Sequence, residues 1–285
     1  MTEIHVRAAD QRDVDAIAKV AAAAGQDEEW SGSDPAYSGH LIEHGRVLVA
    51  EYGGTVGGFG ATQRIGAGAG AVTMLCDLFV DPRHHGLGIG QALLARLWQP
   101  GTARITFSSL HAHALPLYLR AGLDPWWPLL YLTGEVAALT RPQRWTVDHA
   151  QPREVAALQG DWTGVLREHD HLAWAARPGG QALLAGRGGE VLAAGTAGGA
   201  GAEYGIIHLA LSPAAGDAEA RDAVLAVLSS LGPRDGRARV CLPGPHPAAR
   251  PLLAAGWHNE FIDVFMATQP GLLDPRRAVP SPAQA

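Results

Sequence analysis

The sequence contains an internal repeat, and this repeat constrains the fold more than any other feature. The stretch RVLVAEYGGTVGGFGAT (46–62) is matched by QALLAGRGGEVLAAGTA (181–197), and each has a pair of glycines where a hairpin would turn. The apolar run VTMLCDLFVDP (72–82) is likewise matched by YGIIHLALSP (204–213). Because 285 residues suffice for two medium-sized domains, the repeat predicts two tandem copies of one fold.

The first copy shows the order of elements most clearly. Apolar residues recur at helical spacing in 14–24 and 91–98, whereas 72–80 is a continuous apolar run typical of a buried strand. This alternation predicts the α/β class, with an α+β mixed sheet covered by helices. The expected elements are 4–7, 14–24, 37–43, 46–52, 56–63, 72–80, 91–98, 103–110, 113–122 and 126–135, the last as a strand pair or one broken strand.

The two copies differ in their glycine and polar residues. When Pro82 is aligned on Pro213, the glycines of GLGIG (86–90) fall on Asp217, Glu219 and Arg221. A matching alignment further along the chain places Tyr118 on Leu252. The apolar framework therefore recurs while these features do not, which indicates a degenerate second copy. We predict one domain at 1–140, a degenerate one at 145–268, and a flexible tail at 269–285 that is rich in proline and alanine.

Charge and cysteine content exclude several classes of function. The formal net charge of −6 and the pI near 6.1 give no basic surface, which argues against nucleic acid or a membrane as partner. The two cysteines, Cys76 and Cys241, lie in apolar runs without the spacing of a zinc site or a disulfide framework. The N-terminal segment is acidic, and no apolar run approaches the roughly 18 residues of a membrane span. We therefore expect a cytoplasmic protein.

The glycine segment after the strand at 72–80 suggests a site for an anion. A P-loop would need lysine and a hydroxyl residue after its last glycine, where the chain has Gln91 and Ala92. A dinucleotide fingerprint fails because Gln91 stands where its last glycine should be. Backbone N–H groups at a helix N-terminus, not covered by β-carbons, can still hold a diphosphate. The alternative is a tight turn in which glycine only relieves backbone strain.

The segment VDPRHHGLGIG (80–90) resembles the acyl-CoA loop of the GNAT superfamily of N-acyltransferases, V-x-P-x-x-[RQ]-G-x-G-x-[GA]. His85 stands where the family has arginine or glutamine. The aligned segment LSPAAGDAEARDAVL (211–225) lacks these glycines, so we infer that the turn alone does not require them and that a phosphate-bearing ligand does. The resemblance implies acetyl-CoA as co-substrate. The residues it places at the cofactor are Phe79, Val80, His85, Gly86, Leu87, Gly88, Ile89, Gly90, Gln91 and His111.

A second segment, HAHALPLYLRAGL (111–123), resembles the family pattern N-x-x-A-x-x-[LF]-Y-x-x-x-G-[FL], with His111 in place of asparagine. Pro116 is expected in the first turn of this helix, where its missing N–H is harmless. The resemblance implies that Tyr118 protonates the departing thiolate, which is sensible general acid catalysis. The alternative is a tyrosine that only packs against the sheet.

An amine acceptor must lose a proton, because alkyl ammonium groups titrate near 10.4. Asp77 is the candidate base, since CDLFV (76–80) resembles the E-D-[LF]-[FY]-V strand of diamine and related small-amine members. Cys76 replaces the glutamate of that pattern, and Asp77 has the alternative role of orienting neighbouring backbone. His111 and His113 are a further possible relay.

The loop after the first helix is the expected place for contacts with the acceptor. Glu28, Glu29 and Trp30 combine carboxylates with an aromatic ring, which suits an ammonium group, although acidic loops are commonly just solvated. No third ligand accompanies His84 and His85, or His111 and His113, at regular spacing, so no metal is expected.

These patterns predict a tandem GNAT-like protein that transfers an acetyl group from acetyl-CoA to a primary amine by direct attack. The acceptor is a small-molecule or peptide amine, and the degenerate copy is expected to wall its cleft, which predicts a monomer or a weak homodimer. The alternative is a non-catalytic acyl-CoA-binding sensor or interaction protein on the same fold.

Overall fold

The computed structural model describes residues 3–25, 35–66, 71–98, 101–200, 203–233 and 235–282. The first half contains β1 (His5–Ala8), α1 (Val14–Ala23), α2 (Pro35–His44), β2 (Arg46–Tyr52), β3 (Thr55–Ile65), β4 (Val72–Val80), α3 (Ile89–Leu97), β5 (Ala103–Ser109), α4 (Ala114–Arg120) and β6 (Asp124–Glu135). The second half contains β7 (Trp145–Ala150), α5 (Pro152–Thr163), α6 (Glu168–Ala175), β8 (Gln181–Arg187), β9 (Glu190–Ala200), β10 (Glu203–Leu211), α7 (Asp217–Leu228), β11 (Arg237–Pro243), α8 (Ala249–Ala254), β12 (His258–Ala267) and β13 (Ala278–Val279). Short 3₁₀ turns occur at Gln11–Asp13, Pro82–His84 and Val136–Ala138.

The predicted mixed α/β architecture is confirmed, and both copies use the same order of elements. Parallel pairs β4–β5 and β10–β11 lie within otherwise antiparallel strands. Residues 124–135 form the single strand β6, whose register against β12 is irregular. Pro116 lies in the first turn of α4, as expected. Three elements were not predicted, namely α6, β12 and β13.

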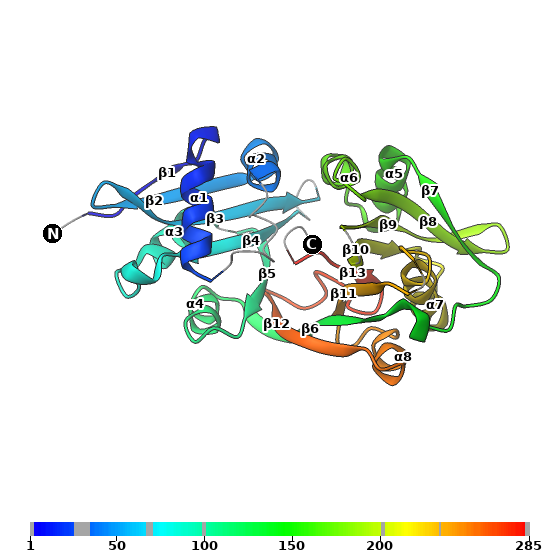
Figure 1. Ribbon diagram of the computed structural model, residues 1–285. Helices are drawn as coiled ribbons and strands as arrows, with labels where there is room; N and C mark the ends of the chain where they lie inside the picture. Colours follow the sequence, from blue (N-terminus) through cyan, green and yellow to red (C-terminus); the bar gives the residue numbers. More distant parts are fainter. Residues whose placement is uncertain are drawn as a thin grey trace.

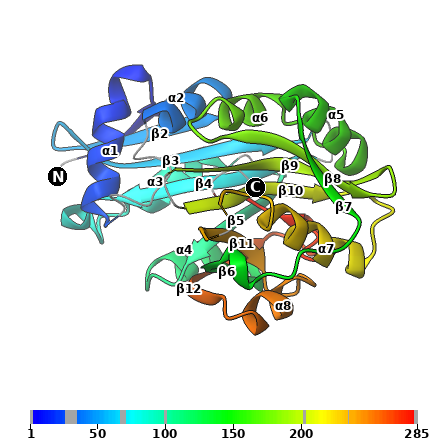
Figure 2. The same cartoon turned by 45° about the vertical axis from the view of Figure 1, so that its right-hand side comes forward.

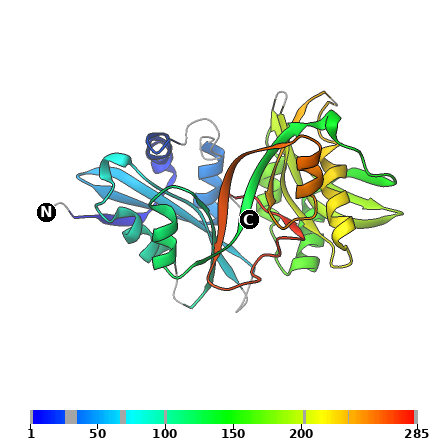
Figure 3. The same cartoon turned by 90° about the horizontal axis from the view of Figure 1, so that it is seen from below.

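One continuous sheet joins the two copies (Figure 1). Its order is β1-β2-β3-β4-β5-β12-β6-β11-β10-β9-β8-β7, with β13 added beside β10. Strand β12, from the end of the chain, pairs with β5 of the first half, and β6 pairs with β11 of the second half. Figure 3 shows β6 and β12 as two long strands that cross the middle of the molecule side by side. Each half of the sheet is therefore completed by a strand from the other sequence repeat.

Helices cover both faces of this sheet. Helices α1, α2, α5 and α6 lie on one side, and α3, α4, α7 and α8 lie on the other (Figure 2). In the first half, Ile17 and Tyr37 of the α1/α2 layer pack on Phe59 of β3, and Leu93 of α3 packs on Leu75 of β4 from the opposite face. A larger core in the second half forms around Val224 and Val227 of α7. Among the helices described here, none is both long and apolar enough to cross a membrane.

The tail differs from the flexible segment expected from its composition. Residues 270–282 pack on the protein, and β13 pairs with β10 through Leu209–Val279 and Ala210–Ala278. Upstream of β13, Leu272 and Leu273 contact the apolar cluster around Phe265. The tail thus packs through a few apolar side chains, although its high content of proline and alanine predicted a flexible segment.

Candidate active site

The first copy opens between β4 and β5. Their parallel ladder runs from the pair Val72–Ala103 to the pair Leu75–Thr106. Opposite β3, Thr62 pairs with Leu75 and Ala61 pairs with Asp77, so Cys76 is the extra residue of a β-bulge. Bulges bend a strand, and the described residues of β4 and β5 form no further ladder pairs beyond this point. The carboxyl ends of the two parallel strands therefore diverge, where ligands of open α/β sheets bind.

The glycine loop lies beside this opening. Gly86 and Gly88 have φ values of +80° and +88°, which residues with a side chain rarely adopt. Helix α3 begins directly after them, at Ile89. A β-carbon at either glycine would meet no atom within 4 Å. Within the described residues, the backbone N–H groups of 86–91 have no protein acceptor. The loop thus offers open space and free N–H groups at the positive end of a helix, which fits a diphosphate.

The neighbouring side chains fix the loop to the sheet. Ile89 is buried under it, whereas Leu87 is 44% exposed at its tip. Asp81 N–H donates to the carbonyl of Gly57 at 3.0 Å. His85 Nε2 lies 3.1 Å from the Val80 carbonyl and, as the only possible donor of the pair, gives it a hydrogen bond. His85 therefore folds back onto the end of β4.

The second copy does not repeat this turn, which corrects the inference that the fold makes it without glycine. Helix α7 begins at Asp217, the position aligned with Gly86, whereas α3 begins three positions later in the alignment. Glu219 Oε2 accepts the backbone N–H of Gly216 at 3.1 Å and so caps α7. The extended helix uses the residues that form the open loop in the first copy. The two turns differ because only the first has glycine where φ is positive.

Three histidine rings surround the entrance to the loop. The rings of His85 and His111 lie 6.2 Å apart, those of His85 and His113 6.0 Å, and those of His111 and His113 5.4 Å. Nowhere in the described ranges do three or more histidine, cysteine or acidic side chains form a group suited to a metal ion. The cluster therefore places polar ring edges around the loop.

Tyr118 lies on α4, on the same face of the sheet as α3. It is only 7% exposed, and its ring lies 6.4 Å from that of Trp98. Burial raises the pKa of Tyr118, and the charges of Asp77 and Asp263 raise it further. The hydroxyl is therefore fully protonated at neutral pH, so it can donate a proton.

Asp77 follows the bulge of β4 on the opposite face of the sheet. Its Oδ2 accepts a hydrogen bond of 2.9 Å from the hydroxyl of Tyr37 on α2, and the pair is buried. Tyr118 packs on the α3 side of the sheet and Asp77 on the α2 side. The predicted acid and base thus lie on opposite faces of the sheet. The aligned residue of the second copy is His208.

Cys76, the bulged residue, packs on the α1/α2 side of the sheet together with Tyr37 and Phe59. Its Sγ is 3.9 Å from Oε1 of Gln63, a weak sulfur contact. Burial raises the pKa of its thiol well above the ordinary value, and the charge of Asp77 adds to this effect. The thiol therefore stays protonated and is a poor nucleophile.

Two further groups reach the site from distant parts of the chain, and neither belongs to a sequence motif. Asp263 of β12 pairs with Ser109 at the end of β5, and its Oδ2 accepts a 2.6 Å hydrogen bond from the hydroxyl of Tyr131. Burial raises the pKa of Asp263. Its only sequence signal was an acidic residue inside the apolar stretch FIDVFMA (261–267).

A polar contact between the copies is the second of these groups. Asp170 of α6 lies 2.8 Å from His40 Nε2 of α2 and accepts a 3.2 Å hydrogen bond from Gln63 of β3. Arg167 lies 3.4 Å from the same carboxylate. Helix α6 of the second copy therefore closes the α2 side of the first. The expected acceptor contacts Glu28, Glu29 and Trp30 lie outside the described residues.

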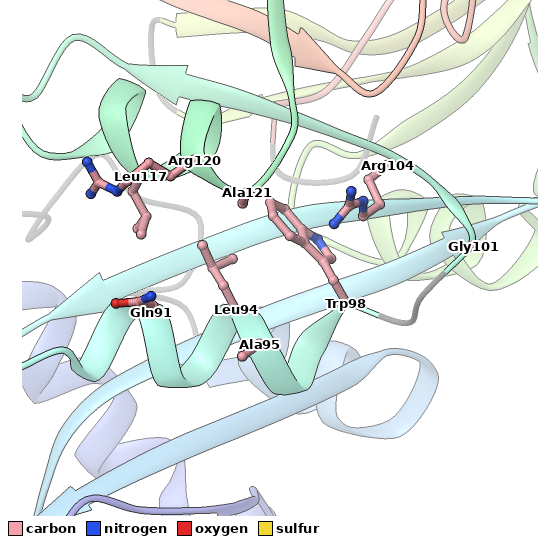
Figure 4. A pocket seen from close by; sticks show the side chains of 9 residues that line it. All are labelled: Gln91, Leu94, Ala95, Trp98, Gly101, Arg104, Leu117, Arg120 and Ala121. Carbon is pink, nitrogen blue, oxygen red and sulfur yellow. The ribbon is translucent and has the colours of Figure 1, made fainter.

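A groove of about 430 Å³ runs between α3 and α4 (Figure 4). Gln91 and Arg120 lie at one end, near the glycine loop, and Arg104 and Trp98 at the other. The Arg104 guanidinium lies 4.9 Å from the centre of the Trp98 ring. The lining residues are Gln91, Leu94, Ala95, Trp98, Gly101, Arg104, Leu117, Arg120 and Ala121.

Comparison with known proteins agrees with this geometry. Residues 43–122 match the acetyltransferase (GNAT) domain family. A Pyrococcus horikoshii protein that is proposed to be an acetyltransferase is 15% identical to this chain, with a TM-score of 0.75. The match covers 99% of this chain and 96% of that protein. A GCN5-related N-acetyltransferase from Sphaerobacter thermophilus is 16% identical (TM-score 0.59; 96% and 98% covered). A tandem GNAT protein from the clavulanic acid biosynthesis pathway is 15% identical (TM-score 0.60; 95% and 100% covered). A search of curated proteins found no significant match.

Residues 43–122 therefore match a GNAT acetyltransferase domain, and the fold of the chain as a whole is the one seen in these solved structures. The matched acetyltransferase domain contains β4, the glycine loop, α3 and Tyr118, so it covers the opening described above.

Proposed function

We propose that this protein is an N-acetyltransferase that transfers an acetyl group from acetyl-CoA to a primary amine by direct attack. The observation that carries the proposal is the open glycine loop in the first copy, next to an opening with Tyr118 on one side and Asp77 on the other. Members of the GNAT family use acetyl-CoA, and the residues here suit it.

The cofactor would be held mainly by backbone. The diphosphate would accept hydrogen bonds from N–H groups of residues 86–91, with Gln91 on the first turn of α3 and His85 and His111 nearby. The amide-containing arm would lie along the end of β4, at Phe79 and Val80, and reach through the opening between β4 and β5. In this proposed arrangement the thioester would lie between Tyr118 and Asp77.

In the proposed reaction, Asp77 takes a proton from the ammonium group of the acceptor, directly or through water. The neutral nitrogen then forms a bond with the thioester carbon, the carbon–sulfur bond breaks, and the leaving sulfur takes the hydroxyl proton of Tyr118. The excess proton that remains on the nitrogen passes through water to the Tyr118 phenolate, and Asp77 releases its proton to solvent, so the products are the amide, the free thiol and one proton. Because the pKa of Tyr118 is raised, its hydroxyl stays protonated until the thiolate leaves. Tyr37 orients Asp77 by its 2.9 Å hydrogen bond.

Direct attack is favoured over an acyl-cysteine route by the state of Cys76. A covalent intermediate requires a thiolate, and burial beside Asp77 disfavours that charge. We propose that Glu28, Glu29 and Trp30 contact the acceptor, and that α6 of the second copy walls its cleft through Asp170. The acceptor is then a small-molecule or peptide amine.

The test is a thiol-release assay with acetyl-CoA across polyamines, amino acids, aminoglycosides and peptides. With an accepted amine, Tyr118→Phe should lower kcat by about 100-fold or more and leave acetyl-CoA affinity nearly unchanged. Tyr204→Phe, in the second copy, is the matched control and should retain full turnover. Full activity of Tyr118→Phe would refute the acid role. Acetyl-CoA binding without turnover of any amine would favour the sensor.

A further inference from the structure

The second copy has the same kind of opening as the first. The parallel ladder of β10 and β11 ends at the pair Ile206–Val240, and Ile207 is the bulged residue. Ile207 aligns with Cys76, so the bulge is kept at the same position in both copies. The second copy has therefore preserved the shape of the cofactor opening although it lost the glycine loop.

Residues of the tail fill this opening. Strand β13 pairs with β10 at Leu209 and Ala210, and the backbone N–H of Leu211 donates to the carbonyl of Arg277 at 3.2 Å. Leu209, Ala210 and Leu211 are only 0%, 3% and 4% exposed, and Val279 belongs to the same core cluster as Leu209 and Leu211. The aligned residues of the first copy, Leu78, Phe79 and Val80, are half-buried. The tail thus lies along the part of β10 that corresponds to the less buried end of β4.

The tail also reaches the position of the glycine loop. The Arg276 guanidinium pairs with Asp217, the first residue of α7, and the Arg277 guanidinium donates to the carbonyl of Ser212. Asp217 and Glu219 place carboxylates at the helix N-terminus, where the first copy has glycine and free N–H groups. Carboxylates there satisfy the helix dipole and repel a phosphate.

We propose that residues 276–282 are a resident peptide ligand of the second copy's groove, held where the first copy takes acyl-CoA. The peptide pairs with β10 as an added strand, and its arginines bind the carboxylates and carbonyls at the start of α7. An extended peptide suits this slot because it presents backbone amides to a free strand edge. A corollary, which rests on the proposed function, is that the chain binds one acyl-CoA.

Hydrogen exchange of the full-length protein, followed by mass spectrometry, tests the peptide ligand without any cofactor. Val279 is fully buried, so Val279→Asp should release β13 and speed exchange at residues 209–211 by about tenfold or more, with β4 unchanged. Leu253→Asp, at an exposed site on α8, is the control and should leave β10 unchanged. Unchanged exchange at 209–211 in Val279→Asp would overturn the proposal.

A milder pair of variants decides the case if Val279→Asp fails to fold. Arg276→Gln removes the pair with Asp217 and should speed exchange at Leu211, whereas Arg250→Gln removes an exposed charge on α8 and should not. Equal exchange in the two would overturn the role of Arg276.

Calorimetry with acetyl-CoA tests the corollary separately. The wild-type chain should bind one equivalent, and Gly88→Val should bind none because a side chain fills the first copy's loop. Two equivalents in the wild type, or one remaining in Gly88→Val, would overturn exclusion from the second groove. No binding by the wild type would refute the proposed function while the exchange result still decides the tail.

Discussion

Gly88 separates the two explanations of the glycine loop. Its φ of +88° means that Gly88→Ala should lower the free energy of unfolding by about 1 kcal/mol. A β-carbon there would meet no protein atom within 4 Å, so clashes within the protein add nothing to this loss of stability. A large effect on acetyl-CoA affinity must therefore come from contact with the ligand. We expect acetyl-CoA affinity to fall about tenfold or more, measured by calorimetry beside urea unfolding.

Gly54 provides the matched control for this substitution. It has φ +82°, equally open surroundings, and lies in the β2–β3 turn. Gly54→Ala should therefore lose similar stability and no affinity. If Gly88→Ala also kept its affinity, the glycine would serve only the turn.

The second half of the chain contains buried neutral histidines. His246 precedes α8, where its Nδ1 accepts the N–H of Ala248 at 3.1 Å, and His171 on α6 donates to Gln159 at 2.8 Å. Burial lowers the pKa of each to about 4. The unfolded chain binds protons near pH 6.5 while the folded chain does not. As the pH falls from 6.5 to about 4, the free energy of unfolding should therefore decrease. Each such histidine contributes a decrease of about 1.4 kcal/mol per pH unit.

Urea unfolding between pH 7.5 and 4.5 measures this slope. His246→Asn keeps an acceptor for the N–H of Ala248 and removes the titration, so its slope should be shallower by about one proton. Leu253→Asn, at an exposed position on α8, adds no titrating group and should keep the wild-type slope. A stability that is flat or rises between pH 6.5 and 4.5 would contradict buried neutral histidines.

Local pattern predicted most elements of this chain, and the reason is physical. Strands such as β4 and helices such as α3 reveal themselves by apolar periodicity, which depends only on which face is buried. Helix α6, EHDHLAWA, has no such stripe because its inward contacts are polar: Asp170 meets His40 of the first copy, and the buried His171 meets Gln159. Periodicity failed there because the partner of the helix is distant in sequence.

The residues of the candidate site likewise fall into those that local sequence reveals and those that it does not. The glycine loop and Tyr118 are contiguous motifs, so sequence sufficed to find them. Asp263 enters through β12, and only the pairing with β5 reveals that it reaches the site. Strand pairing is set by long-range register, which a single sequence does not show.

For the whole molecule, the exchange of β6 and β12 makes the halves interdependent. Strand β12 covers the edge of β5, and β6 supplies the neighbour of β11. A fragment of residues 1–140 alone would expose the β5 edge and leave β6 without β11 and β12 as partners. The sequence repeats are therefore not units that fold separately.

Cleavage of the linker tests this interdependence. A specific protease site inserted at 140–144, in the exposed stretch before β7, should be cut without separating the halves. Because β6 and β12 bind each fragment to the other along two long ladders, the cut protein should elute with the intact one and keep its unfolding transition near the same urea concentration. Residues 1–140 expressed alone should aggregate or stay unfolded, since the edge of β5 lacks its partner. Two separate, folded fragments on a sizing column would contradict the exchange.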